Sequence, residues 1–346
     1  MKTVRPTPKT IGSSRGNKSK RARDSAHFAS NSPSPGSRLP LAGEQALRHR
    51  EKEPEGADSI PTYPAQSHQS EFQGAGIRRH WESSRMSTPS SNPVPTGTTA
   101  IITGGSRGLG FEVARGLAAQ GYQLALIAKD PQGLAQASEK LAAEFPQSSV
   151  SSFAIDFEVT TPTALDRARQ QLAEVRSATA TPTALVIAHA VMSEKMSKTL
   201  RTSDAEWRRV LAINLDSTFM VVNELVPPMA EARAGRVVIF SACLGRMSGP
   251  GNAGGLAPYR ISKAGVNALV RNLAHETGMG ARGLLVDAIC PNHSRTDMGG
   301  PDAFRSAEEG AETALWLLDR PFNHQSENEI ERTTGVLWED HQIVPW

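Results

Sequence analysis

The chain has 346 residues and a net charge of +3, with 38% hydrophobic and 21% charged residues. This length and composition suffice for one large core, and the sequence has no apolar run of 18 residues or more that would predict a membrane span. The two cysteines, Cys243 and Cys290, lack metal-ligand spacing, so the sequence predicts neither a disulfide scaffold nor a metal site, and it fits a reducing, cytoplasmic location.

Residues 1–97 differ in composition from the rest of the chain. They hold 11 of the 23 prolines and carry 15 Lys/Arg against 8 Asp/Glu, and their apolar residues follow no helical or strand period. Such a segment cannot bury enough apolar surface to offset the entropy of an ordered chain. The sequence therefore predicts a disordered, basic, Pro/Ser-rich tail over residues 1–97.

The role of this tail stays open between several alternatives. Its first 23 residues contain eight Lys/Arg, no acid and the run KSKRAR, a composition that fits organelle targeting or a nucleic-acid patch. A solvated tail, or an upstream extension before Met86, is favoured because the segment lacks the Leu/Phe stripe of an amphipathic presequence. Nucleic-acid binding is disfavoured, since the remainder of the chain carries 27 Asp/Glu against 23 Lys/Arg.

From residue 98 onward, short apolar runs alternate with helical patterns. The expected strands are TTAIIT, YQLALIA, VSSFAID, ALVIAHAV, RVVIFSA, LLVDAIC and a closing strand near the C-terminus. The expected helices lie between them, including long ones at about 203–233 and 257–276. Apolar strands separated by helices predict an α/β fold over residues 98–346: a single Rossmann-like, doubly wound parallel sheet with helices on both faces.

A glycine-rich loop, TGGSRGLG, joins the first expected strand to the first helix. Glycines let the backbone approach a phosphate closely, and a helix N-terminus supplies free N–H groups and a partial positive charge. This context indicates a pyrophosphate site rather than a simple turn. The cofactor-binding residues expected in the loop are Gly104, Ser106, Arg107, Gly108, Leu109 and Gly110.

The end of the second expected strand bears on which nicotinamide cofactor binds. An acid at this place suits the ribose 2′-hydroxyl of NAD, whereas a basic residue suits the 2′-phosphate of NADP. Here Lys129 follows Ala128, and Arg107 in the loop adds a second cation. Together they favour NADP(H), although the neighbouring Asp130 weakens the argument.

Tyr259 and Lys263 lie four residues apart in a stretch that should open a helix, so both project from one face. A free tyrosine, with a pKa of about 10, is a poor acid–base catalyst at neutral pH. We expect the nearby ammonium to lower that pKa, which would let the pair pass a proton to a carbonyl oxygen. The glycine-rich loop upstream favours this interpretation over a surface helix.

With these motifs in order, residues from about 98 to the C-terminus resemble the classical short-chain dehydrogenase/reductase family. TGGSRGLG is similar to the family's cofactor loop, and Tyr259 with Lys263 matches its Y-x-x-x-K motif. The resemblance implies that Asp156 meets the adenine ring and that Thr296 binds the nicotinamide carboxamide. It also implies that Asn214 is a catalytic residue that kinks a helix and holds a proton-relay water.

The segments RTDMGGP, SAEEGAETALWLL and IVPW resemble the carbonyl-reductase-like branch of the family. This resemblance implies an NADPH-dependent reductase of aldehydes and ketones, with a small-molecule carbonyl or alcohol as its substrate. A homo-oligomer is compatible with the sequence but is not specified by it. The substrate would be selected by loops at about 191–202, 243–258 and 292–305, whose shapes composition does not define.

Two departures from the family pattern affect the cofactor side of the site. The family's N-N-A-G reads Ile187-Ala188-His189-Ala190 here, and we expect His189 to be a packed, neutral side chain rather than a new acid. The family's P-G turn reads Pro291-Asn292. Because asparagine tolerates a positive φ better than most residues, we expect this turn to survive.

The third departure concerns the catalytic serine. Aligned on Gly245, the chain places Ala242 where the family's carbonyl-polarising serine stands, with Ser241 one residue early. A shifted register would make Ser241 the catalytic hydroxyl, and Ser248 is the alternative donor. Cys243 is expected to be a small apolar residue. Because Tyr259, Lys263 and Asn214 are all retained, the sequence favours an active reductase over an inactive NADP-binding scaffold or sensor.

Overall fold

A computed structural model describes residues 97–194, 198–249 and 254–346. Residues 1–96 of the predicted tail, which include its basic run and Met86, lie outside the described residues. The helices and strands from residue 99 onward follow one another as the sequence predicts. The strands are β1 (Thr99–Thr103), β2 (Gln123–Ala128), β3 (Val150–Ala154), β4 (Ala184–Ile187), β5 (Gly235–Phe240), β6 (Leu284–Ile289), β7 (Leu337–Glu339) and β8 (Gln342–Val344).

These strands form one sheet in the order β3-β2-β1-β4-β5-β6-β7-β8, parallel except for the antiparallel pairing of β7 with β8. The order reverses direction between β1 and β4, which are neighbours in the sheet but distant in sequence. In open α/β sheets, ligands bind beyond the carboxyl ends of the strands at such a point. The fold therefore places a crevice beside the ends of β1 and β4.

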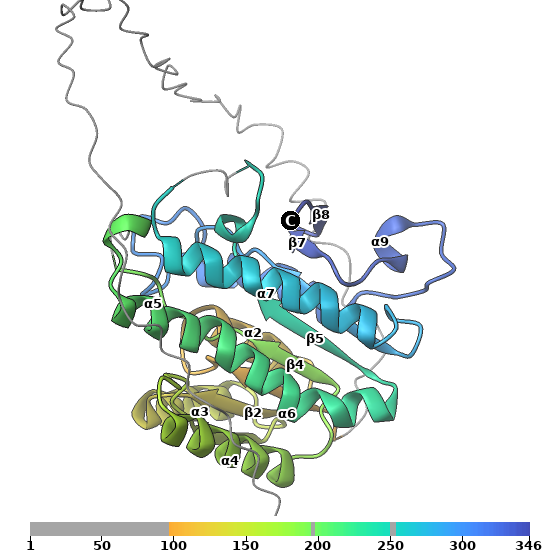
Figure 1. Ribbon diagram of the computed structural model, residues 1–346. Helices are drawn as coiled ribbons and strands as arrows, with labels where there is room; N and C mark the ends of the chain where they lie inside the picture. Colours follow the sequence, from red (N-terminus) through yellow and green to blue (C-terminus); the bar gives the residue numbers. More distant parts are fainter. Residues whose placement is uncertain (1–96, 195–197, 250–253) are drawn as a thin grey trace, which may run out of the picture. The chain divides into compact units, whose positions relative to one another are not determined.

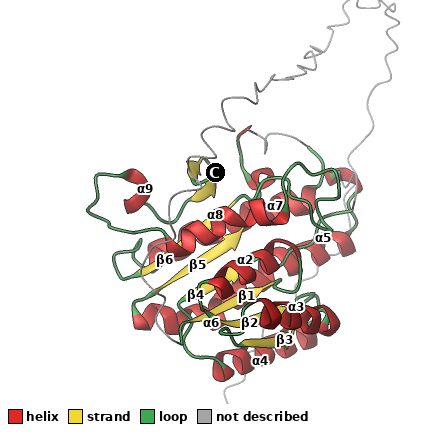
Figure 2. Ribbon diagram, turned by 180° about the vertical axis from the view of Figure 1, so that it is seen from behind, coloured by secondary structure: helices red, strands yellow, loops and turns green. Residues whose placement is uncertain are grey.

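Helices cover both faces of the sheet, as Figures 1 and 2 show from opposite sides. The helices are α2 (Gly108–Ala119), α3 (Pro131–Glu144), α4 (Pro162–Ala178), α5 (Asp204–Leu211), α6 (Ser217–Ala232), α7 (Ala257–Glu276), α8 (Ala307–Asp319) and α9 (Glu329–Arg332), with shorter turns at η1 (Thr199–Arg201), η2 (Ala212–Asp216) and η3 (Cys243–Gly245). One core cluster joins one face of the sheet to α4, α6 and α7, and the other joins the opposite face to α2, α3 and α8. The doubly wound fold predicted from the alternating pattern is thus confirmed.

The helical stretch Asp204–Ala232 is long and apolar enough to cross a membrane, the only such stretch in the described part of the chain. More than half of its most apolar window is buried inside the protein. Its α6 part contributes side chains such as Met220 and Leu225 to the core cluster beside the sheet. Its apolarity is therefore that of a core helix packed on a sheet.

A buried ion pair fixes the last parallel strand to the sheet. Arg320, just after α8, lies 3.2 Å from Asp287 of β6, and both side chains are almost fully buried. Asp287 also accepts hydrogen bonds from the Trp338 indole and the Gly335 amide, each at 3.0 Å. Arg320 donates to the Thr333 carbonyl as well. The pair thus ties the segment before β7, and β7 itself, to the centre of the fold.

Candidate active site

The predicted site residues converge at the carboxyl ends of β1, β4, β5 and β6. The glycine-rich loop follows β1, His189 follows β4 and Ala242 follows β5. Tyr259 and Lys263 lie in the first turns of α7, which contacts β6 and the η3 turn after β5. The site therefore lies where parallel α/β sheets bind their ligands.

The glycine-rich loop needs glycine because its backbone is closely packed. A Cβ on Gly110 would lie 2.3 Å from the Gly104 carbonyl oxygen, and a Cβ on Gly104 would lie 2.8 Å from the backbone nitrogen of His189. Gly104 and Gly108 also have positive φ, at +70° and +56°. Larger side chains at these positions would fill the loop and force its backbone apart. The loop can therefore present its backbone directly to a ligand.

The loop ends at the N-terminus of α2, which begins at Gly108. No side chain caps this terminus, and the first turn contains no acidic residue. Its N–H groups are thus available to an anion, and the helix dipole favours negative charge there. Thr296 lies opposite, since a Cβ on Gly108 would be 3.2 Å from its methyl group. The residues present fit a pyrophosphate between α2 and the loop after β6.

The charged residues at the end of β2 form a separate group. Lys129 lies 2.9 Å from Asp156, and both side chains are exposed by half or more. Hydrogen bonding to Asp156 raises the pKa of Lys129, which keeps it cationic. Asp130 caps α3 by accepting from the backbone N–H groups of Gln132 and Gly133. Because these hydrogen bonds already engage its carboxylate, Asp130 is less available to bind a ribose hydroxyl than its position at the end of β2 suggests.

Arg107, the second predicted phosphate ligand, lies at the other side of the loop. Its guanidinium is 2.7 Å from Asp297, and both side chains are about three-quarters exposed. Exposed pairs of this kind contribute only about 0–1 kcal/mol. Arg107 and Lys129 can therefore leave their present partners for a phosphate at little cost.

Tyr259 is buried among apolar side chains at the start of α7. Ala242 and Val210 form its innermost contacts, with Met192 and Leu256 packed around them. Burial raises the pKa of the Tyr259 hydroxyl. The predicted lowering of this pKa is therefore wrong. Tyr259 stays protonated at neutral pH and is a weaker acid than a free tyrosine.

Lys263 lies on the same helical face as Tyr259, as the i, i+4 spacing predicts. Its Nζ is 5.9 Å from the centre of the Tyr259 ring. The ammonium donates a 2.7 Å hydrogen bond to the Phe240 carbonyl at the end of β5. Burial lowers the pKa of Lys263 to about 8. Lys263 is thus held between α7 and β5 and can change protonation near neutral pH.

Asn214 ties the loop after β4 to α7. It lies in η2, where the α-helical hydrogen-bonding pattern gives way to a π-helical turn. Its side chain accepts from the Val191 N–H at 2.8 Å and donates to the Val191 carbonyl at 2.9 Å. It also donates to Ser262 at 3.0 Å, and Ser262 donates to the Tyr259 carbonyl at 2.7 Å. Asn214 therefore positions the first turn of α7.

Two members of this support were not predicted from the sequence. Ser262 carries the bond from Asn214 to α7, and the Ser193 hydroxyl accepts from the Tyr259 backbone N–H at 2.9 Å. Both hydroxyls are buried. Ser262 could have been found from its position, because it stands three residues after Tyr259 on the same helix. No pattern in the loop after β4 singles out Ser193.

Ser241 does not fit the catalytic role predicted for it. Its side chain is buried, and its hydroxyl donates a short hydrogen bond to Oδ1 of Asn267, two turns along α7 from Tyr259. A serine has only one hydroxyl proton, and here that proton is used in packing α7 on β5. Alternation along β5 turns Ser241 toward α7, so the expected shift of register does not occur.

Ala242 instead occupies the wall of the site beside Tyr259. The alternative donor, Ser248, is exposed in the loop after η3, and its role stays a prediction. Beyond β6, Asn292 has a φ of +58°, so the turn after Pro291 survives in the left-handed conformation that asparagine tolerates.

His189 bridges the cofactor loop and the helix that carries Asn214. One ring nitrogen lies 2.7 Å from the Thr103 hydroxyl and the other 2.7 Å from that of Ser217. Ser217 donates its own proton to the Ile213 carbonyl at 2.6 Å, so it must accept from His189 Nε2–H. Nδ1 then accepts from Thr103. This satisfied, neutral histidine also stacks on Phe157.

Burial, aided by the Lys263 ammonium, lowers the pKa of His189 to about 3. Between that value and its ordinary pKa of about 6.5, the unfolded chain binds more protons at this site than the folded chain. The free energy of unfolding should therefore fall as pH drops below about 6.5. From pH 7.5 to 5.5 we expect the His189→Asn variant to lose about 1 kcal/mol less than the wild type. Urea unfolding at both pH values measures this, and equal losses would refute it.

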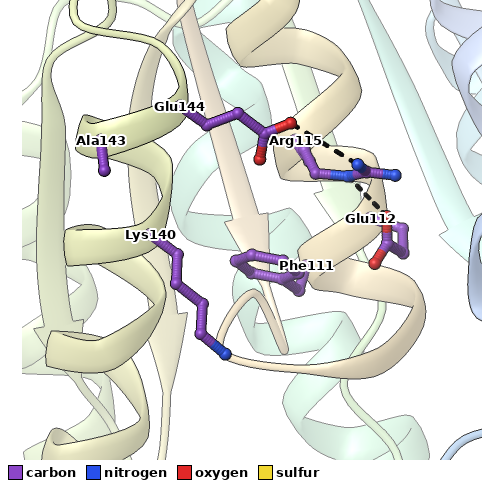
Figure 3. A pocket seen from close by; sticks show the side chains of 6 residues that line it. All are labelled: Phe111, Glu112, Arg115, Lys140, Ala143 and Glu144. Carbon is purple, nitrogen blue, oxygen red and sulfur yellow. Dashed lines mark hydrogen bonds and ion pairs between the residues drawn. The ribbon is translucent and has the colours of Figure 1, made fainter.

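A cavity of about 590 Å³ lies elsewhere, between α2 and α3 on the sheet face opposite α7 (Figure 3). Three of its charged side chains pair with one another, since Arg115 is 2.8 Å from Glu112 and 3.6 Å from Glu144. None of the residues predicted for catalysis lines it. This groove is therefore separate from the residues predicted for catalysis.

Residues 98–304 match the family model for short chain dehydrogenases, and the chain belongs to this family of oxidoreductases. Among curated relatives, the 3-oxoacyl-[acyl-carrier-protein] reductase FabG of Staphylococcus epidermidis is 30% identical over 200 residues. That match covers 58% of this chain and 76% of the relative. FabG of Escherichia coli K12 is 29% identical over 202 residues, covering 58% and 75%.

Solved structures share the fold at low sequence identity. A short chain dehydrogenase from Salmonella enterica has a TM-score of 0.61 and 20% identity, covering 72% of this chain and 98% of its own. A Shigella flexneri protein described as a short chain dehydrogenase, and complexed with NADP, has a TM-score of 0.58 and 22% identity. That match covers 71% of this chain and 97% of the other. These likenesses support the doubly wound fold described above.

Proposed function

We propose that this protein is an NADPH-dependent reductase of aldehyde or ketone carbonyls, working in the cytoplasm on a small-molecule substrate. The observation that supports the proposal is the Asn214–Ser262 link, which fixes the first turn of α7, with Tyr259 and Lys263, to the η2 turn. An NADP-complexed neighbour and reductase relatives support the same chemistry. A bound NADPH supplies the hydride that the carbonyl carbon accepts.

The chain's own residues supply the remaining parts of the reaction. The α2 N-terminus and the backbone at Gly104 and Gly110 would hold the pyrophosphate, with Thr296 on the opposite side. Tyr259, which is protonated at neutral pH, donates its proton to the carbonyl oxygen as charge develops there. Lys263, with a pKa of about 8, lies on the same face and can share that proton. The apolar wall of Ala242 and Val210 limits the access of water.

We expect turnover to be limited by the missing hydroxyl at residue 242. Losing one donor to a developing oxyanion costs about 10²–10³ in turnover. Ala242→Ser should therefore raise kcat by tenfold or more, because the residue packs directly against Tyr259. Ser241→Ala is the matched control, since it removes a hydroxyl next door that is already bonded to Asn267. Ser241→Ala should leave kcat unchanged. If steady-state kinetics gave Ala242→Ser the kcat of the wild type, the prediction would be contradicted.

We expect Lys129 to set the preference for NADPH over NADH. A hydrogen bond to a charged group contributes about 1.5–3 kcal/mol, which corresponds to a tenfold change in affinity or more. Lys129→Ala should therefore weaken NADPH binding at least tenfold and leave NADH binding unchanged. Lys140→Ala, in the groove between α2 and α3, is the control. If a fluorescence titration showed that Lys129→Ala and Lys140→Ala bind NADPH equally well, Lys129 would not be a cofactor-binding residue.

The second candidate is a cofactor-binding scaffold or sensor with little turnover, which Ala242 at the serine position favours. Mixing the full chain with NADPH and a panel of aldehydes, ketones and diketones separates the two. The reductase proposal predicts substrate-dependent loss of the nicotinamide absorbance. Tight NADPH binding without loss for any substrate would favour the scaffold.

A further inference from the structure

The two cysteines of the chain meet at the edge of the candidate site, although they are 47 residues apart. Cys243 opens the η3 turn after β5, and Cys290 follows β6. Because Phe240 pairs with Ile289 across the two strands, both cysteines emerge at the same end of the sheet. The Cys243 backbone N–H donates to the Cys290 sulfur at 3.0 Å. Both residues are free thiols.

We propose that Cys243 and Cys290 form a reversible disulfide when a hydroperoxide oxidises them, and that this bond switches off the reductase. The proposed loss of activity rests on the reductase function proposed above, whereas the formation of the Cys243–Cys290 disulfide does not. Adjacent strand ends give the two residues the proximity that a disulfide requires. Neither thiol is needed for the proton transfer by Tyr259.

The two thiols differ in a way that assigns them separate roles. Cys243 is half-buried, whereas Cys290 is only 1% exposed. The hydrogen bond from the Cys290 thiol lowers the pKa of Cys243 to about 7, and the same contact raises that of Cys290. A thiolate is the reactive form toward peroxide, and accessible thiolates beside a second cysteine are typical redox sensors. Cys243 is thus the residue that reacts first, and Cys290 resolves the product.

The chemistry takes two steps. The Cys243 thiolate attacks one oxygen of the hydroperoxide, so an S–O bond forms, the O–O bond breaks and an alcohol or water leaves after taking up a proton. Cys243 becomes a sulfenic acid and the hydroperoxide is reduced. The Cys290 sulfur then attacks the sulfenic sulfur, forming the S–S bond and releasing water with the Cys290 proton. A dithiol reductant reverses the change by disulfide exchange.

The structure couples this bond to the catalytic residues. Ala242 and Leu244, on either side of Cys243, both pack in the cluster around Tyr259. Gly245 touches the backbone of Lys263 so closely that a Cβ there would lie 2.7 Å away. An S–S bond of about 2.05 Å is shorter than any thiol–thiol contact, so the η3 turn must move to form it. That movement changes the contacts of Ala242 and Leu244 with Tyr259 and the packing of Gly245 against Lys263.

The test uses the full chain, hydrogen peroxide and a thiol-blocking reagent, followed by intact-mass and peptide mass spectrometry. We expect a disulfide that links the peptides containing Cys243 and Cys290. Cys290→Ser should stop at a sulfenic acid on Cys243 that dimedone traps, whereas Cys243→Ser should show neither product. Peroxide that leaves both thiols of the wild type free for blocking would overturn the proposed bond.

Turnover with NADPH is followed in the same samples. We expect the oxidised wild type to lose activity at least tenfold and to recover within twofold after dithiothreitol. Each of Cys290→Ser and Cys243→Ser is compared with its own untreated activity and should resist the disulfide-dependent loss. A disulfide that leaves turnover unchanged would overturn the switch. If the reduced chain shows no turnover at all, the reductase proposal fails while the mass data still decide the disulfide.

Discussion

Replacing Tyr259 by phenylalanine should lower kcat for carbonyl reduction by about 10²–10⁴, the usual contribution of a positioned proton donor. The ring would remain in its apolar contacts with Ala242 and Val210, so only the hydroxyl is removed. Tyr259 stays protonated across neutral pH, because burial raises its pKa. The variant should bind NADPH as tightly as the wild type.

Steady-state kinetics and a cofactor titration measure both effects in one preparation. Tyr122→Phe is a matched control, since Tyr122 precedes β2 at the opposite end of the strands from the site. Its turnover should equal that of the wild type. If Tyr259→Phe kept wild-type kcat, another group would have to supply the proton, and the role assigned to Tyr259 would fall.

Arg320→Met should reduce the free energy of unfolding by about 3–5 kcal/mol, the cost of leaving a buried charge without its partner. Asp287 would keep its bonds from Gly335 and Trp338 but lose the guanidinium. Burial already raises the pKa of Asp287 above that of an ordinary carboxyl, even with Arg320 present. Removing Arg320 should also free the segment before β7, since its bond to the Thr333 carbonyl is lost.

Arg176→Met provides the comparison, because Arg176 lies 3.1 Å from Glu224 but is half exposed. Such surface pairs contribute only about 0–1 kcal/mol. Urea unfolding of the two variants should therefore separate them by at least 2 kcal/mol. Similar losses in both variants would mean that the buried pair does not anchor the C-terminal strand.

The fold could be predicted because its signals are local. Each buried strand is a short apolar run, and α7 occupies Ala257–Glu276, as its periodicity predicts. The helical pattern at 203–233 also holds, except that it turns π-helical around Asn214. What periodicity could not show is the antiparallel β8 at the sheet edge, because pairing direction depends on the turn between β7 and β8.

The site could be predicted only where a motif fixes the spacing. Tyr259 and Lys263 share a face because a helix requires it, and the glycine-rich loop lies where a strand meets a helix. Whether Ser241 could act in catalysis depended on which side of β5 its side chain faces. Its hydrogen-bond partner Asn267 is 26 residues away in the chain, so the sequence pattern did not show this contact. The pKa of Tyr259 was predicted in the wrong direction because burial raises it, and the Y-x-x-x-K motif does not show how deeply the tyrosine is buried.

Hydride transfer itself is the most direct test of the proposed function. The full chain would be incubated with NADPH carrying deuterium at the transferable position and with a carbonyl substrate from the panel. The proposal predicts an alcohol with one deuterium on the carbinol carbon, formed in equal amount with NADP⁺. If the protein bound NADPH but the carbonyl substrate was recovered unreduced and without deuterium, the result would contradict the proposed reductase activity and favour the scaffold.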